Sequence, residues 1–141
     1  MKIKPHLKDL YRTNPDAKSR HQSLRLDMNE SVNGLPVAFV KHVLRKIDSE
    51  LLASYPGYKN VQEKIAAING IGYENICLSN GSDAAIKYIF DAYVMPNDKV
   101  LLTDPTFAMY HVYCAIFNAK PSIVSYKSDL AFPKSEFISH I

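Results

Sequence analysis

The sequence contains no long hydrophobic run. No stretch approaches the roughly 18 consecutive apolar residues of a transmembrane helix, and residues 1–25 contain no apolar core of a signal peptide. We therefore expect a cytoplasmic protein with no membrane attachment. Cysteine is scarce: Cys77 and Cys114 stand far apart, without the C-x-x-C spacing of zinc and redox sites. Both lie in apolar surroundings, so we expect buried structural thiols in a reducing compartment.

Sequence motifs of several common enzyme classes are also missing. The phosphate-loop pattern G-x-x-x-x-G-K-[ST] is absent, and the close pair Gly70 and Gly72 lacks the third glycine of a dinucleotide-binding loop. The chain has no G-x-S-x-G elbow of a serine hydrolase, and its five histidines are too scattered for a zinc motif. The sequence therefore predicts neither of these nucleotide-binding loops and no bound metal.

The net charge of +3 is unevenly distributed along the chain. Residues 1–25 contain seven Lys or Arg and two Asp, whereas residues 26–141 contain ten basic and twelve acidic side chains. A basic segment of this kind can neutralise the phosphates of a nucleic acid. Because it carries no recognition motif, we expect a polar arm that is solvated or docks on a partner, and no nucleic acid.

Hydrophobic periodicity predicts the first helices. Apolar residues at spacings of three and four predict one helix from about residue 36 to residue 54, where Pro56 stops it. Asn60 and Glu63 resemble a capping box at the start of the next helix, which Gly70 or Gly72 ends.

Three short apolar segments predict strands at residues 76–78, 100–102 and 122–126. Helical patterns separate them, one ending before Pro96 and one covering about residues 107–118. Strands that alternate with helices favour an α/β fold with a mostly parallel sheet and covering helices.

The chemically most informative segment is residues 78–84, where a predicted strand runs through a glycine into a helix. The first amides of a helix have no partner within it, and the helix dipole adds about half a positive charge at this end. A phosphate can therefore bind here, because Gly81 and the small polar residues around it let a ligand approach the backbone. The same residues also suit ordinary helix capping by Ser82 or Asp83, which needs no ligand.

Four segments resemble, in the same order, motifs of the histidinol-phosphate aminotransferases. Residues 26–36 (LDMNESVNGLP) resemble that family's L-x-x-N-E-N-P-x-G segment, and residues 54–56 (SYP) its R-Y-P. Residues 75–83 (NICLSNGSD) resemble its E-x-I-x-x-G-x-G-S-D-E stretch, and residues 104–110 (DPTFAMY) its P-T-Y-x-x-Y. The resemblance also extends to the threonine-phosphate decarboxylases and related enzymes of phosphorylated amino acids.

This resemblance implies the N-terminal portion of a fold type I transferase that depends on pyridoxal 5'-phosphate (PLP). Residues 1–30 would form an extended N-terminal arm. Residues 31–59 would form a helix and linker that contribute to the small domain or the dimer interface. Residues 60–141 would form the first part of the large PLP-binding α/β domain.

The resemblance also implies a cofactor site. The backbone amides of Ser82 and Asp83 would bind the PLP phosphate, with Gly81 leaving room for it. Phe107 would stack on the pyridine ring, where the family commonly has Tyr. Ala84 is a second departure, since it replaces an acidic residue of the family motif.

Three further residues receive roles from the resemblance. Tyr55 would donate its hydroxyl to the PLP phosphate of the neighbouring subunit, in a homodimer with shared active sites. Asn29 and Glu30 would lie near the entrance for a small amino donor or acceptor.

The catalytic residues of the family lie beyond the matched region, and none of them is predicted within this chain. The Schiff-base lysine is absent from residues 1–141, so we expect a full-length aminotransferase of which this chain alone is inactive. The substrate would be a small, phosphorylated amino compound. Two alternatives remain: a PLP-dependent decarboxylase of a phosphorylated amino acid, and a non-catalytic α/β module that binds a phosphorylated ligand.

Overall fold

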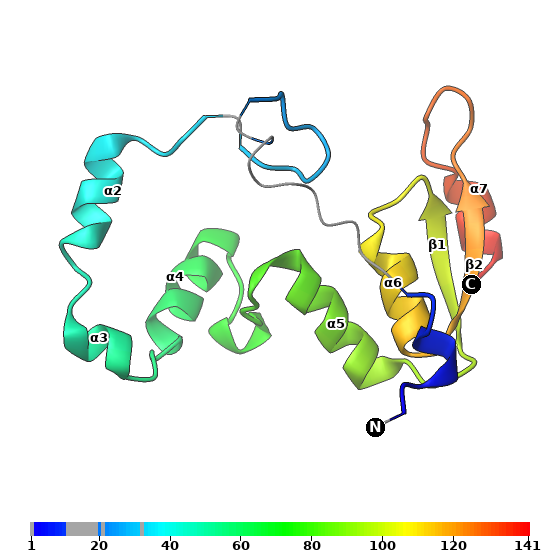
Figure 1. The fold of residues 1–141 in the computed structure, drawn as a ribbon, viewed down its shortest axis with the longest axis horizontal. Coiled ribbons are helices and arrows are strands. Elements are labelled where there is room, and N and C mark those ends of the chain that lie inside the picture. Colours follow the sequence, from blue (N-terminus) through cyan, green and yellow to red (C-terminus); the bar gives the residue numbers. More distant parts are fainter. Residues whose placement is uncertain (1, 11–19, 21, 32) are drawn as a thin grey trace. The chain divides into compact units, whose positions relative to one another are not determined.

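The computed structural model describes residues 2–10, 20, 22–31 and 33–141 (Figure 1). Its contacts divide the chain into two compact units. Unit 1 comprises Met1–Tyr11 and Cys77–Ile141, and unit 2 comprises Arg12–Ile76; each is described by itself. The boundaries predicted near residues 30 and 60 stay predictions. Among the described residues, no helix is long and apolar enough to cross a membrane.

Unit 2 is helical. Its elements are α2 (Val37–Leu44), α3 (Ser49–Ala53), α4 (Lys59–Asn69) and the 3-10 turn η2 (Tyr73–Asn75). We predicted one helix over residues 36–54, and the structure has two, α2 and α3. The prediction is therefore wrong for the residues between Leu44 and Ser49. Asp48 has an extended backbone, and its side chain accepts a hydrogen bond of 2.8 Å from the Leu51 amide. This bond caps α3 as a separate helix, although the apolar periodicity continues through α2 and α3.

The start of α4 also differs from the prediction. The helix begins at Lys59 after Tyr58, which provides no side-chain cap. Asn60 therefore lies inside the helix, and the predicted capping box is wrong. Glu63 instead forms an ion pair with Lys59, at 3.8 Å and one helical turn away. The predicted end is confirmed, since Gly70 follows the helix with a left-handed φ of 66°.

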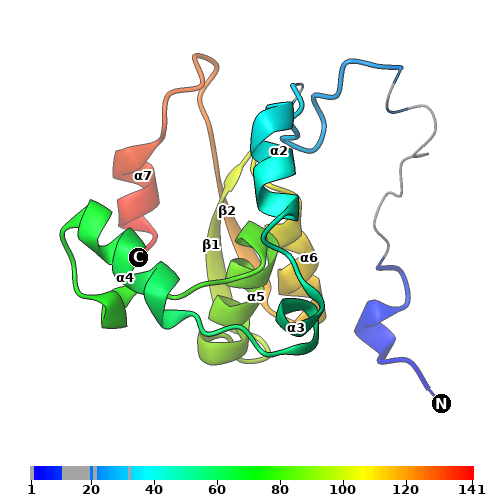
Figure 2. The ribbon, with the colours of Figure 1, turned by 90° about the vertical axis from the view of Figure 1, so that its left-hand side faces the viewer.

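Unit 1 is an α/β unit. Its elements are η1 (Pro5–Leu7), α5 (Gly81–Tyr93), β1 (Lys99–Asp104), α6 (Met109–Ile116), β2 (Lys120–Ser125) and α7 (Lys134–Ser139). The two strands are parallel, with Lys99 opposite Lys120 and Asp104 opposite Ser125. In Figures 1 and 2, α6 and α7 lie on opposite sides of these strands. The predicted α/β class with parallel pairing is confirmed.

Residues 76–78 do not form the predicted strand. Ile76 has extended backbone angles, φ −107° and ψ 118°, as a strand residue would. The sheet within the described residues contains β1 and β2 alone, so nothing there pairs with this segment. A strand requires a hydrogen-bonded neighbour, which local sequence cannot provide.

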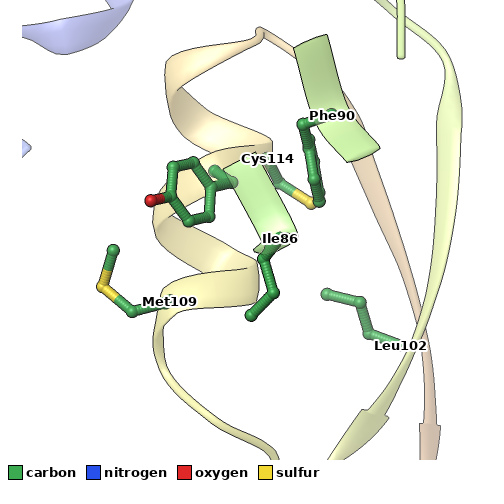
Figure 3. Close-up of a cluster of buried hydrophobic side chains, with 6 residues drawn as sticks. Ile86, Phe90, Leu102, Met109 and Cys114 are labelled. Atoms are coloured by element: carbon green, nitrogen blue, oxygen red, sulfur yellow. The ribbon is translucent and has the colours of Figure 1, made fainter. Parts of the chain in front are cut away.

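One hydrophobic cluster holds unit 1 together (Figure 3). Its buried members come from α5, β1 and α6: Ile86, Phe90, Leu102, Met109, Tyr113 and Cys114. The ring of Phe90 lies at the centre, 5.8 Å from the Tyr113 ring and 5.6 Å from the Phe117 ring between centroids. These contacts fix α5 against α6.

The two cysteines have different environments. Cys114 is buried in this cluster, and burial raises the pKa of its thiol. Cys77 is exposed, so the prediction that both thiols are buried is wrong for this residue. Its apolar neighbours indicated a strand inside a sheet, and no strand forms there.

Replacing Phe90 by Ala should lower the free energy of unfolding by about 3–5 kcal/mol, because a buried ring is lost and a cavity remains. Ile89 is the adjacent residue of α5 and is exposed, so Ile89→Ala should change the same quantity by less than about 1 kcal/mol. Urea unfolding of both variants, followed by circular dichroism, measures the difference. Equal losses in the two variants would contradict the central place of Phe90 in the core.

Candidate functional site

The start of α5 has the geometry of an anion-binding helix terminus. Gly81, Ser82 and Asp83 are its first three residues. The Gly81 amide donates to the Ser79 carbonyl at 2.9 Å, and the amides of Ser82 and Asp83 belong to the turn that has no partners within the helix. The preceding Asn80 makes no side-chain capping hydrogen bond. Neither Ser82 nor Asp83 stands at the N-cap position, which Asn80 occupies. The predicted placement at a helix start is confirmed.

Gly81 leaves open space beside this turn. Its φ is 74°, which residues with a side chain rarely adopt, and a Cβ added there would meet no atom within 4 Å. The hydroxyl of Ser79 donates a 3.0 Å hydrogen bond to the Gly81 carbonyl and so stabilises the loop before the helix. A ligand can therefore approach the backbone at Gly81 without meeting neighbouring atoms.

Phe107 lies in the loop between β1 and α6. It remains 43% exposed, so its ring is not part of the core. The ring of Tyr110, one turn further on, meets it edge to face with centroids 6.5 Å apart. This contact orients the Phe107 ring and leaves part of it open to a flat ligand.

The fold brings Phe107 and the start of α5 to the same end of unit 1. Since α5 leads into β1 and α6 follows it, both helix starts lie at the carboxyl end of that strand. Side-chain contacts agree with this arrangement. Ile86 of α5 and Met109 of α6 share the buried cluster (Figure 3), and the Tyr113 hydroxyl donates to the Asp83 carbonyl at 3.1 Å. Ligands of open α/β sheets bind at this end of the strands.

The other predicted site residues belong to unit 2. Tyr55 follows α3 and is fully exposed. Asn29 has a left-handed φ of 52°, a conformation that asparagine tolerates better than most residues. Glu30 forms ion pairs with Arg20 at 3.0 Å and with Arg25 at 2.6 Å. The binding roles of these three residues stay predictions.

Sequence reasoning missed the partners of Glu30. It treated Arg20 and Arg25 as members of a basic arm, because their contacts follow no regular spacing. Arg20 also binds both carboxylate oxygens of Asp27, at 2.8 and 3.1 Å. These hydrogen bonds lower the pKa of the Asp27 carboxyl group. The excess positive charge of residues 1–25 is therefore partly neutralised by the acidic residues that follow.

Comparison with known proteins identifies the family. The family Aminotransferase class I and II matches residues 22–134 of the chain. The chain belongs to this family. A histidinol-phosphate aminotransferase of Clostridium novyi is 30% identical over 128 residues, which are 89% of this chain and 36% of that protein. One of Clostridium kluyveri is 34% identical over 102 residues, 71% of this chain and 29% of that protein.

A solved aminotransferase structure shares the fold of this chain. The crystal structure of histidinol-phosphate aminotransferase from Sinorhizobium meliloti, in complex with pyridoxal-5'-phosphate, superposes with a TM-score of 0.72. It is 19% identical and the match covers 90% of this chain, so it shows that the fold is shared. The match covers 35% of that structure, and this chain spans about a third of the length of the relatives it matches.

Replacing Gly81 by Ala should lower the free energy of unfolding by about 1–2 kcal/mol, because a Cβ is strained at this positive φ. The cost comes from backbone strain, since no atom lies near the added group. Gly57→Ala is the matched control: its surroundings are equally open, and its φ is not in the left-handed region. Thermal unfolding of both variants measures the difference. Equal stabilities would contradict the left-handed conformation of Gly81.

Proposed function

We propose that the whole protein is a cytoplasmic PLP-dependent aminotransferase that acts on a small, phosphorylated amino compound. In this proposal the present chain provides the phosphate-binding part of the cofactor site. The observation that carries the proposal is the start of α5, where the backbone amides of Ser82 and Asp83 and an open glycine lie at the carboxyl end of β1. Family membership and the names of the relatives support the reaction and the class of substrate.

The residues at this end of unit 1 fit PLP. Its phosphate is an anion of the size that a helix N-terminus binds, and the amides of Ser82 and Asp83 would donate to it. The open space at Gly81 would take the phosphate, since a side chain there would fill it. The exposed ring of Phe107 would cover one face of the pyridine ring.

The chemistry is divided between the cofactor and the protein. When bound, PLP supplies an electron sink for reactions at the carbon that bears the amino group. The residues of this chain bind the phosphate and orient the ring. We assign covalent attachment of the cofactor to a lysine outside residues 1–141. Decarboxylation of a phosphorylated amino acid would use the same phosphate and ring contacts.

The test removes one amide from the proposed phosphate site. Ser82→Pro deletes the N–H at the second position of α5, where proline is compatible with a helix. Loss of one charge-assisted hydrogen bond, about 1.5–3 kcal/mol, should weaken PLP binding by about ten- to a hundredfold. Pyridoxal lacks the phosphate, and its binding should be unchanged. Fluorescence titration of the whole protein with both compounds gives the dissociation constants.

Ser135→Pro is the matched control for this test. It removes the amide at the second position of α7, a helix outside the proposed site, and should leave PLP binding unchanged. Equal affinity of the unaltered protein for PLP and pyridoxal would contradict the proposed function.

We further infer that the enzyme is a homodimer with shared active sites, in which Tyr55 donates its hydroxyl to the PLP phosphate of the neighbouring subunit. Full exposure of Tyr55 supports this assignment, since an aromatic side chain at the end of a helix is then available to a partner. Asn29 and Glu30 would lie near the entrance for the amino substrate. The paired Arg20 and Arg25 would hold the Glu30 carboxylate in place.

Subunit mixing tests the shared site. A Tyr55→Phe subunit of the whole protein is combined with a subunit that lacks the cofactor lysine. If Tyr55 acts across the interface, each heterodimer has one intact site and one site with both defects, so activity recovers at limiting PLP. In the control mixtures, a Tyr58→Phe subunit replaces the Tyr55→Phe subunit. Tyr58 is a nearby exposed tyrosine, so these mixtures show the activity expected when Tyr55 is intact. Activity no higher than that of the Tyr55→Phe sites would contradict a role across the interface.

A further inference from the structure

Tyr113 joins the two segments of the proposed cofactor site. It lies in the second turn of α6 and is 8% exposed. Its hydroxyl donates a 3.1 Å hydrogen bond to the backbone carbonyl of Asp83, in the first turn of α5. Its ring packs against Phe90, so the ring and the hydroxyl both connect α6 to α5.

This hydrogen bond ends next to the proposed phosphate amides. Asp83 is the third residue of α5 and directly follows Ser82. At the other end of the bond, Tyr113 belongs to the helix that follows Phe107 after one intervening residue. The bond therefore limits movement between the amides and the segment that carries the proposed ring-stacking residue.

We propose that Tyr113 is a positioning residue for the cofactor phosphate. By fixing the first turn of α5 to α6, its hydroxyl holds the amides of that turn in the direction from which they bind the phosphate. A site whose donors are already oriented binds its ligand more tightly, because less conformational freedom is lost on binding. This inference rests on the proposed function.

The role differs from that of an ordinary core contact. Phenylalanine at position 113 would keep the ring packing against Phe90 and lose the hydroxyl alone. The backbone of α5 would keep its internal hydrogen bonds, since a helix carbonyl also accepts the amide four residues on. The expected consequence is therefore a loss of phosphate recognition in a folded protein.

The experiment compares PLP with pyridoxal, which carries the same ring and aldehyde without the phosphate. In the whole protein, Tyr113→Phe should weaken PLP binding by about three- to tenfold, the effect of one neutral hydrogen bond, and leave pyridoxal binding unchanged. Tyr88→Phe is the matched control, because it removes a tyrosine hydroxyl from the exposed face of α5. It should leave both dissociation constants unchanged.

The outcomes separate this inference from the proposed function. Equal binding of PLP and pyridoxal by the unaltered protein contradicts the proposed function itself. If that protein prefers PLP and Tyr113→Phe retains the full preference, the role of Tyr113 is wrong. An equal loss of affinity for both compounds also contradicts it, since that is the effect of general destabilisation. Tyr113→Met, which likewise removes the hydroxyl, is measured in the same way if the phenylalanine variant does not fold.

Discussion

The packing of α5 against α6 and β1 determines where the groups of the candidate site lie. Phe90 stands at the centre of this contact, between the rings of Tyr113 and Phe117. Ile86 and Met109 extend the contact towards the starts of the two helices (Figure 3). Because α5 runs into β1 and α6 runs out of it, a core that aligns the helices also brings their first turns to one end of the strand. Core packing and site geometry are therefore consequences of one set of contacts.

The same arrangement would let a short segment bind the proposed phosphate without a positively charged side chain. The first turn of α5 presents backbone amides, and Gly81 adds open space in place of a Cβ. The field of the helix is strongest at this end, and it needs no lysine or arginine. In the proposed site, recognition of the cofactor ring would be separate and would depend on Phe107, an exposed aromatic residue of the next loop. Binding of phosphate and ring would then require that the starts of α5 and α6 keep a constant separation. This requirement would link the proposed function to the packing between the two helices.

In unit 2, ion pairs connect residues that lie apart in the sequence. Arg20 binds the carboxylates of Asp27 and Glu30, and Arg25 binds Glu30 as well. These pairs connect the basic arm to the segment that resembles the family's substrate-entrance motif. Ion pairs near the surface contribute little to stability, so their effect is on the local conformation more than on folding.

Sequence alone determined the features that depend on neighbouring residues. The apolar segments predicted β1 and β2, and a glycine followed by small polar residues predicted the start of α5. Four ordered motifs predicted the aminotransferase family, which the comparison establishes for residues 22–134. Tertiary structure decided the rest, because contacts between distant residues leave no periodic signal. Residues 76–78 look like a strand but have no neighbour to pair with in the described sheet, and Cys77 is exposed for that reason. The bond from Tyr113 to Asp83 spans 30 positions, and the packing of α6 on α5 alone brings these two residues into contact.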